Sequence, residues 1–342
     1  MPEQKEIMRA ASIKDVATHA GVAVGTVSNV LNYPDRVSSK TRERVQASIS
    51  ELGFVRNDVA RQLRAGHSRT IGLVVLDIGN PFFSSVARAA EDAAAERGNV
   101  VLLGNSGHNI SREEHYIELF EEQRVQGVLI SPVTENSKRL ADLAAKGPKV
   151  VLVDSPSRTG EFSSVSVDDV YGGYLATKHL LDIGRRRIAF VAGPLQFHQV
   201  SDRLAGAKQA IEECPDATLE VLQASDLTVL AGREAGDSLV ERKRRNLPDG
   251  LFCTNDLLAL GIMQSLTMLR TIRIPEDVAL VGYDDIDFSA SAVVPLTSIQ
   301  QPTAKIGSTA VELLIEQLES PGVPPRSVVF KPELIIRASS CP

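Results

Sequence analysis

The sequence is poor in several residue types whose absence narrows its class. It contains no tryptophan, and aromatic residues make up only 4% of its 342 residues. Its three cysteines, Cys214, Cys253 and Cys341, lie far apart, which argues against a disulfide framework and favours a reducing cytoplasm. No apolar run approaches the ~20 residues that a transmembrane helix needs. The first ten residues carry four charged side chains and no apolar core, so we expect neither a secretory signal nor a membrane association.

Motifs that would indicate an enzyme or a cofactor are also missing. No Gly-x-Gly-x-x-Gly follows a strand-like run, so a dinucleotide site has no support. No Gly-x-Ser-x-Gly motif or other nucleophile–base pattern occurs. The six histidines have no metal-ligand spacing. We therefore expect no metal and no cofactor, and a sugar-processing enzyme is a remote alternative.

The residues that are present divide the chain into a basic head and an acidic body. A chain that is 43% hydrophobic and 23% charged is an ordinary globular protein, and its length suggests two or three domains. Residues 1–69 hold 11 Lys and Arg against seven Asp and Glu, a net charge of +4, whereas the remainder has a net charge of −10. This asymmetry favours a head that meets a polyanion, although small domains also vary by a few charges.

The segment from Ser12 to Phe54 predicts three short helices. Ser12 and Asp15 form a capping-box pattern, and Gly21 ends the first helix. The second helix is expected from Val24 to Asn32, and a third begins at Ser38 or Ser39. A helix, a tight turn and a second helix of this length are typical of a helix-turn-helix. The exposed face of the second helix offers small or uncharged side chains that suit a DNA groove: Val24, Gly25, Thr26, Ser28 and Asn29.

From Ile71 onward, strand-like runs alternate with helical stretches. Strands are expected at 71–77, 100–106, 127–133, 149–155, 187–193, 250–256 and 278–285, with helices near 81–97, 112–123, 137–146, 168–183, 200–213, 228–240 and 255–270. About 270 residues of β-α units predict two parallel-sheet lobes. Polar residues follow several strands, namely Asp77, Asn80, Asp154, Asn255, Asp256, Asp284 and Asp285. Their positions indicate a ligand cleft, although Asp and Asn also serve as turn formers and caps there.

Several motifs together resemble one known family. SIKDVATHAGVAVGTVSNVLN (12–32), VSSKTRERVQ (37–46), LGF (52–54) and NDVARQL (57–63) are similar to the DNA-binding part of the lactose/galactose-repressor (LacI/GalR) family of bacterial transcription regulators. In the body, NPFF (80–83), AGP (192–194), DRLAG (202–206), TND (254–256), VGYDD (281–285) and TSIQQP (297–302) follow the order and spacing of that family. The resemblance covers nearly the whole chain.

The resemblance implies an N-terminal all-α helix-turn-helix headpiece and an α/β core of two parallel-sheet lobes like periplasmic binding proteins. The implied domains are a headpiece at 1–56, a hinge helix and linker at 57–68, an N-terminal lobe at 69–165 and 294–327, and a C-terminal lobe at 166–293 and 328–342. It further implies a cytoplasmic homodimer that binds double-stranded, palindromic operator DNA and represses transcription. A small effector bound between the lobes would control it by shifting the population of lobe arrangements.

The resemblance also assigns DNA-contacting residues. They are Ser12, Val24, Gly25, Thr26, Ser28 and Asn29 in the headpiece, and Asn57, Ala60, Arg61 and Leu63 in the hinge. Leu63 corresponds to the hinge residue that wedges into the minor groove in this family. Two residues depart from the family pattern: Arg56 stands where proline usually precedes the hinge helix, and Ala23 stands where Ser or Thr usually caps the second helix.

The effector-binding residues implied by the resemblance are Phe82, Phe83, Asp154, Phe197, Gln199, Arg203, Leu227, Asn255, Asp284 and Gln301. The guanidinium of Arg203 suits paired hydroxyls or a carboxylate. Leu227 departs from the family, because many relatives place a large aromatic residue there. His198 is either a pocket-rim residue or an exposed loop histidine, and we expect Asp256 and Asp285 to act as caps.

The resulting prediction is a transcriptional regulator whose effector is a sugar or sugar derivative. A purine or another metabolite acting as a corepressor is the alternative within the same class. A transport-type sugar-binding protein is the alternative from another class, and the attached head argues against it.

Overall fold

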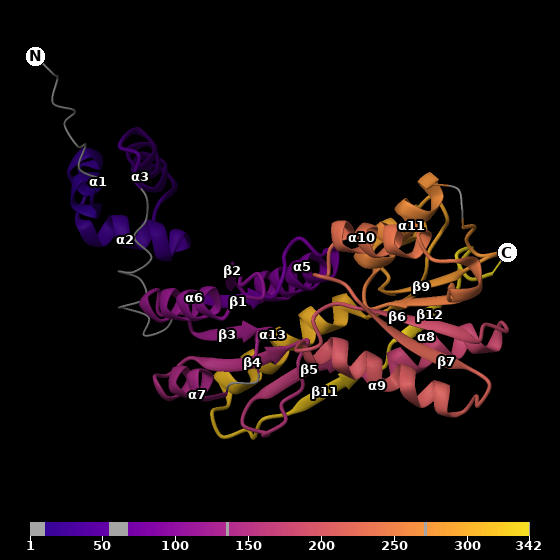
Figure 1. Ribbon diagram of the computed structural model, residues 1–342. Helices are drawn as coiled ribbons and strands as arrows, with labels where there is room; N and C mark the ends of the chain where they lie inside the picture. Colours follow the sequence, from indigo (N-terminus) through magenta and orange to yellow (C-terminus); the bar gives the residue numbers. More distant parts are fainter. Residues whose placement is uncertain (1–10, 55–67, 135–136, 270–271, 342) are drawn as a thin grey trace, which may run out of the picture. The chain divides into compact units, whose positions relative to one another are not determined.

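The computed structural model describes residues 11–54, 68–134, 137–269 and 272–341 (Figure 1). The chain divides into two compact units, residues 1–68 and residues 69–342. No helix in these described ranges is both long and apolar enough to cross a membrane.

The first unit contains the three expected helices: α1 (Ile13–Ala20), α2 (Val24–Asn32) and α3 (Ser39–Glu51), with a short 3-10 turn, η1 (Pro34–Arg36). The Ser12 side chain accepts a hydrogen bond from the backbone of Asp15, whose carboxylate accepts one from the backbone of Ser12, so the predicted capping box is present. Gly21 ends α1 with φ of 59°, a conformation that glycine adopts without strain. The helices enclose a small core, which includes Val16, Val27 and Val45.

The second unit contains two six-stranded sheets, which occupy its two halves (Figure 1). The first sheet has the order β11-β5-β4-β3-β1-β2 and is entirely parallel. Its strands are β1 (Thr70–Val75), β2 (Val100–Asn105), β3 (Gly127–Ile130), β4 (Lys149–Val153), β5 (Ser163–Val167) and β11 (Ser327–Phe330). The second sheet has the order β12-β10-β9-β8-β6-β7, with only β12 antiparallel. Its strands are β6 (Arg187–Ala192), β7 (Thr218–Gln223), β8 (Gly250–Cys253), β9 (Ala279–Asp284), β10 (Thr297–Gln300) and β12 (Glu333–Ile335).

Helices cover both faces of each sheet. On the first lobe, α5 (Pro81–Glu96) and α13 (Thr303–Glu319) pack on one face, and α6 (Ile110–Glu122) and α7 (Ser137–Ala145) on the other. On the second lobe, α8 (Asp169–Asp182) pairs with α9 (His198–Glu212), and α10 (Val229–Val240) pairs with α11 (Asp256–Leu269). Two short elements, η2 (Arg244–Asn246) and α12 (Asp287–Ala290), lie in loops of the second lobe. The predicted fold class, a helical head and two parallel-sheet α/β lobes, is confirmed.

The lobe boundaries differ from those predicted from sequence. Residues 294–327 were assigned to the first lobe, but β10 pairs with β9 in the second sheet. Residues 166–167 and 328–330 were assigned to the second lobe, but they belong to β5 and β11 of the first sheet. The boundaries were misplaced because strand pairing, rather than position along the chain, decides which lobe a short segment joins.

The chain crosses between the lobes three times: after β5, after β10 and after β11. The first and last of these crossings are hydrogen-bonded to each other, because Asp168 N donates to Phe330 O over 2.9 Å. The three crossings place the carboxyl ends of the parallel strands of both sheets beside the junction between the lobes.

Candidate functional site

The second helix of the first unit presents a distinct exposed face. Val27 and Val30 are buried against α1 and α3, whereas Val24 is 40% exposed and therefore lies outside the core. Gly25 and Asn29 are exposed, and Thr26 and Ser28 are half-buried. Ala23 gives the helix no side-chain cap, in agreement with the departure seen in the sequence. The helix can therefore offer uncharged groups to a partner without disturbing the core.

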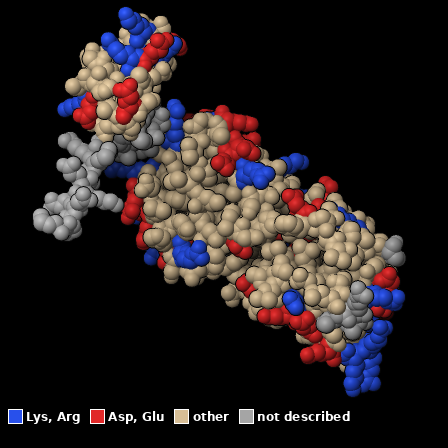
Figure 2. Space-filling model, turned by 90° about the horizontal axis from the view of Figure 1, so that it is seen from above, with Lys and Arg blue, Asp and Glu red and all other residues tan. Residues whose placement is uncertain are grey.

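The basic charge of the head does not come mainly from the described helices. Residues 11–54 hold five Lys and Arg and four Asp and Glu, and both signs are interspersed on the surface (Figure 2). Of the remaining excess of three positive charges, two belong to residues 55–67, outside the described ranges, and one to Arg69. The hinge residues Asn57, Ala60, Arg61 and Leu63, together with Arg56, also lie outside the described residues.

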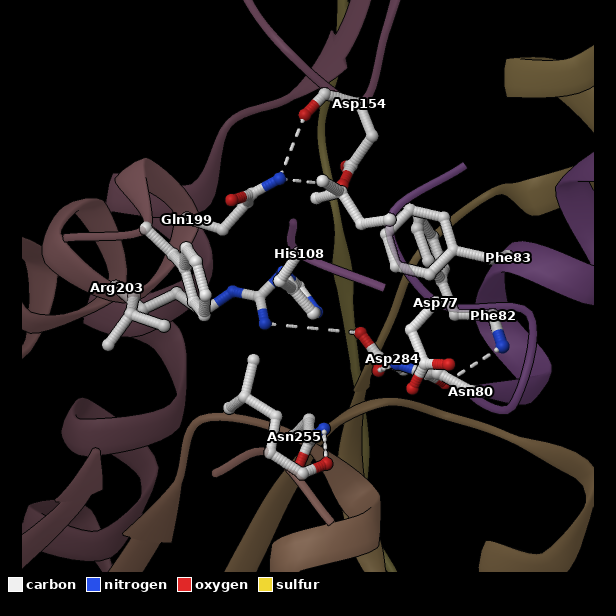
Figure 3. Close-up of a pocket in the computed structure, with 14 residues that line it drawn as sticks. Asp77, Asn80, Phe82, Phe83, His108, Asp154, Gln199, Arg203, Asn255 and Asp284 are labelled. Carbon is white, nitrogen blue, oxygen red and sulfur yellow. Dashed lines mark hydrogen bonds and ion pairs between the residues drawn. The ribbon is translucent and has the colours of Figure 1, made fainter. Parts of the chain in front are cut away.

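A pocket lies between the two lobes of the second unit, and its empty space of about 490 Å³ includes the part that opens to solvent (Figure 3). The pocket brings together nine of the ten residues expected to bind an effector: Phe82, Phe83, Asp154, Phe197, Gln199, Arg203, Leu227, Asn255 and Asp284. The tenth, Gln301, does not line the pocket, but its Nε2 donates a hydrogen bond to Oδ1 of the lining residue Asp284 over 2.8 Å.

The first lobe contributes residues from loops that follow its strands. Asn80 caps α5 by accepting a hydrogen bond from Phe82 N over 3.0 Å, and this places Phe82 and Phe83 in the first turn of the helix. Their rings meet edge to face, with centroids 5.0 Å apart. His108 follows β2 and Asp154 follows β4.

Three residues that line the pocket have left-handed backbones, which is unusual for residues other than glycine. The φ angles are 55° for His108, 54° for Asp154 and 104° for Asp284. Such conformations cost free energy and occur most often at functional sites. Three of the five positive-φ residues of this kind in the described chain line this one pocket, which marks it as a site.

The second lobe contributes Arg203 from α9. Its Nε donates to Asp169 Oδ1 over 2.8 Å, and its Nη1 donates to Thr254 O over 2.6 Å. The guanidinium lies over the ring of Tyr283, 3.6 Å from the centroid. These contacts fix the planar group at the wall of the pocket, 4.0 Å from Asp284 Oδ1. Burial opposes the charge of Arg203, but Asp169, Tyr283 and Asp284 raise its pKa, so it stays protonated.

Hydrogen bonds cross the pocket from lobe to lobe. Asn80 Nδ2 donates to Asp284 Oδ2 over 3.1 Å, and Gln199 Nε2 donates to Asp154 Oδ2 over 2.9 Å (Figure 3). His198 Nε2 lies 3.2 Å from Asp154 O, so it contacts the rim rather than only solvent. The lobes are therefore joined across the site by polar contacts that a ligand can replace.

The carboxylic acids at the site have perturbed pKa values. Burial, reinforced by the nearby Asp169, raises the pKa of Asp154 to about 8. Burial raises the pKa of Asp284 to about 6 against the opposing effect of Arg203. Burial lowers the pKa of His108, so its imidazole is neutral at pH 7. Perturbed groups that face one cavity are typical of a binding or catalytic site.

Some buried polar atoms at the site have no hydrogen-bond partner within the described chain. They are Oδ1 of Asp154, Nδ1 of His108 and Oε1 of Gln301. Unpaired buried polar atoms are costly, which favours a ligand that supplies the missing partners. Asn255 is less available, because its Oδ1 caps α11 at Leu258 N and its Nδ2 donates to Leu227 O.

Sequence reasoning did not assign every residue of this pocket. Leu76, Asp77, Asn80, His108 and Val200 also line it. Asp77 and Asn80 follow β1, and His108 follows β2, so a position just after a strand is the sequence signal that these three residues share. Asp256 and Asp285 lie outside the pocket lining, and neither is the helix cap expected from sequence. Asn255 caps α11 instead, while Asp256 accepts hydrogen bonds from Ile286 N, Ser289 Oγ and Ser298 Oγ, and Asp285 accepts them from the side chains of Gln300 and Arg337. No cluster of three or more potential metal ligands occurs within the described ranges.

Comparisons with known proteins agree with this arrangement. Residues 12–57 match the family described as bacterial regulatory proteins, lacI family, and residues 177–340 match the periplasmic binding protein-like domain. The chain is 34% identical over 336 residues to the HTH-type transcriptional repressor PurR of Vibrio atlanticus (strain LGP32), covering 96% of this chain and 98% of the relative. It is 35% identical over 335 residues to the protein of the same name from Vibrio vulnificus (strain CMCP6), with the same coverage.

Solved structures show the same architecture. The lac repressor dimer bound to operator and the anti-inducer ONPF is 26% identical, with a TM-score of 0.82 over 97% of this chain and 99% of that chain. The complex of the transcriptional regulator CelR with cellobiose is 31% identical, with a TM-score of 0.71 over 96% of this chain and 100% of that chain. The chain therefore belongs to the LacI family of bacterial transcriptional regulators, and it is a DNA-binding repressor with an effector domain rather than an enzyme.

Proposed function

We propose that this repressor binds a palindromic operator as a homodimer and that a sugar or sugar derivative, held between the lobes of its core, controls that binding. The observation that carries the effector assignment is the buried, unpartnered Oδ1 of Asp154 in a pocket that also presents Arg203 and three phenylalanine rings. We assign the headpiece to residues 1–56 and the hinge to residues 57–68.

The chemistry of the pocket suits a polyhydroxylated ligand. Hydroxyl groups donate to carboxylate oxygens such as those of Asp154 and Asp284, and they accept hydrogen bonds from a guanidinium. Phe82, Phe83 and Phe197 can cover the C–H faces of a sugar ring. Two similar solved structures contain sugars: the CelR complex contains cellobiose, and a LacI-family regulator from Enterococcus faecium, 30% identical, contains ribose.

The DNA-binding assignment rests on the exposed face of α2. Val24 suits a thymine methyl group, Asn29 suits a base edge, and Ser12, Thr26 and Ser28 suit phosphates or nearby bases. From the family pattern, Asn57, Ala60, Arg61 and Leu63 are proposed to form the minor-groove contact at the centre of the operator.

The dimer assignment is supported by an apolar edge on the first lobe. Val100, Leu102 and Leu103 lie in β2, the edge strand of the first sheet, and all three are exposed. They continue into a shallow groove between β2 and α5, lined in part by Ala87 and Val101. A second copy placed on this edge by two-fold symmetry would cover it and bring two headpieces to one operator.

A gel-shift titration of the full chain on palindromic DNA tests the DNA-binding half of this proposal. Phosphate contacts release counterions, so affinity is expected to fall steeply as salt concentration rises. Adding sugars, polyols or purines to the same assay, and to a thermal-shift assay, tests the effector half. An affinity that does not change with salt would contradict the DNA-binding role, and a response to a purine alone would contradict the sugar assignment.

A further inference from the structure

The charged groups that line the pocket are mostly acidic. Asp77, Asp154 and Asp284 bring three carboxyl groups to its wall, and Arg203 is the only lysine or arginine among the described lining residues. His108 also lines the pocket and is uncharged at pH 7, because burial lowers its pKa. Whether an anionic ligand is attracted or repelled therefore depends on whether the guanidinium of Arg203 is free to pair with it.

The positive charge of Arg203 is already committed within the protein. Its Nε and the carboxylate of Asp169 form an ion pair at 2.8 Å, and both side chains are only 7% exposed. Its Nη1 donates to Thr254 O, and Tyr283 lies against one face of the guanidinium. Asp284 lies 4.0 Å away on the pocket side. A ligand anion would compete with two carboxylates for this one cation.

Asp154 presents an acceptor that no protein group satisfies. The residue is 3% exposed, its Oδ2 accepts from Gln199, and its Oδ1 has no partner within the described chain. A hydroxyl group can donate to this oxygen. Asp154 itself is protonated at neutral pH, because its pKa is about 8, so the like charge that a phosphate or carboxylate would meet in the pocket is that of Asp284, whose pKa is about 6.

We propose that the pocket selects an uncharged or positively charged polyol, such as a sugar or an amino sugar, and rejects sugar phosphates and sugar acids. This inference rests on the proposed function, because it assumes that the effector is a sugar or sugar derivative. Because like charges placed together in a desolvated site are strongly unfavourable, we expect an anionic counterpart to bind about 100-fold more weakly or worse.

Calorimetric titration of the full chain with chemically matched ligands tests the selection. A suitable series is glucose, glucosamine, gluconate and the phosphate monoester of glucose, with the corresponding ribose compounds and cellobiose as further probes. We expect binding only by uncharged or amino members. Binding of a phosphate or carboxylate member as tightly as its neutral parent would overturn the charge selection and leave the sugar assignment intact. Binding by no member of any charge would contradict the sugar assignment itself.

A substitution tests the role of the acidic pocket wall. Asp284→Asn keeps the shape of the side chain and removes a negative charge that lies 4.0 Å from Arg203, so the preference for neutral over anionic members should shrink at least tenfold. Asp142→Asn, on the exposed face of α7, is the matched control and should leave the preference unchanged. If Asp284→Asn does not fold by circular dichroism, Asp77→Asn on the half-buried rim replaces it, with the same expected direction. An unchanged preference in the folded pocket variant would refute the assignment.

Discussion

At the scale of single residues, Asp154 combines three unusual properties in one side chain. It is buried, it has a left-handed backbone with φ of 54°, and its pKa is raised to about 8. None of these properties stabilises the fold of the unliganded core at alkaline pH. Strained backbones and perturbed pKa values are typical of functional sites, so the three properties together are best explained by a role of Asp154 in ligand binding.

The stability of the unliganded protein should therefore depend on the protonation of Asp154. The folded state holds this proton up to about pH 8, whereas the unfolded chain releases it near the ordinary value of 3.8. The stabilising contribution is thus complete below the unfolded pKa and is lost as pH rises through the folded one, by at most about 1.4 kcal/mol per pH unit. Asp154→Asn should show a shallower fall of Tm between about pH 5 and about pH 9. Parallel falls of Tm in the two proteins would contradict this.

Arg203 should be required for the effector response but not for operator binding. Arg203→Lys keeps the charge but cannot hold Asp169 and Thr254 O with the same planar geometry. We expect effector affinity to fall at least about tenfold, which corresponds to ~1.4 kcal/mol, while the gel shift without effector is retained. Arg233→Lys on the exposed side of α10 is the control. A normal effector response in Arg203→Lys would place the site elsewhere.

At the scale of elements, the position of the Arg203 side chain depends on how closely α9 approaches α8. Gly206, on α9, lies against α8 so tightly that an added Cβ would be 1.8 Å from Val170 O. Gly173, on α8, faces the backbone of Arg203, and a Cβ added there would be 2.0 Å from Arg203 O. The two helices can therefore pack at this distance only because both contact positions lack a side chain.

Gly206→Ala should displace α9 and with it Arg203. Overpacking of this kind costs ~1–3 kcal/mol, so we expect a lower Tm together with weakened effector binding. Gly322→Ala, in the turn after α13, is the matched control, because its added Cβ would meet no atom within 4 Å. Calorimetry and thermal unfolding of the full chain check both effects. Unchanged effector affinity in Gly206→Ala would show that α9 does not depend on this contact.

The absence of a side-chain cap on α2 predicts that a substitution at Ala23 can stabilise the protein. Ala23→Ser supplies the oxygen that the helix N-terminus lacks and should stabilise α2 by ~1 kcal/mol. Hydrogen exchange of the α2 amides in the full chain should slow accordingly, with the amides of α3 as an internal reference. Equal exchange in both proteins would mean that the cap does not form.

The elements predicted from sequence were those with strong apolar patterns. The seven apolar strands were found, but β5 was missed, because its serines are buried through hydrogen bonds such as Ser164 Oγ to Ser327 Oγ rather than by apolar character. The edge strand β7 was missed because it is only partly buried. The helix α13 could have been predicted, since Ile306, Ala310 and Leu313 follow a helical period.

At the scale of the whole molecule, the fold class could be predicted, whereas the division of the lobes could not. Alternating β-α units predict parallel sheets covered by helices, and the structure agrees. The sequences of the short strands β10 and β11 do not indicate which sheet each strand joins. For β11, the sheet is decided by pairing with β5, which lies more than 100 residues away along the chain. Polar pocket residues such as Asp154 and Asp284 could be predicted because the carboxyl ends of parallel strands gather at one edge. Arg203 and the phenylalanines were expected only from the family resemblance.

The proposed dimer makes a prediction that concerns the whole assembly. Introducing lysine at Val100 and Leu102, two exposed positions of β2, should prevent a second copy from covering this edge. Analytical ultracentrifugation should show monomers, and operator affinity should fall about 100-fold because two linked headpieces bind far more tightly than one. Val221→Lys, on the edge strand β7 of the other sheet, is the control. A dimer that persists with both lysines in place would mean that the copies meet at another surface.

The three crossings between the lobes limit what the core can do when a ligand enters. A single covalent connection would let one half drift in any direction, but three connections, two of them bonded through Asp168 and Phe330, resist stretching and sliding. The motion that remains is a hinge rotation or a twist of one lobe relative to the other about these three connections. The repressor should accordingly register its signal as a change of angle, with little change in the spacing of its halves.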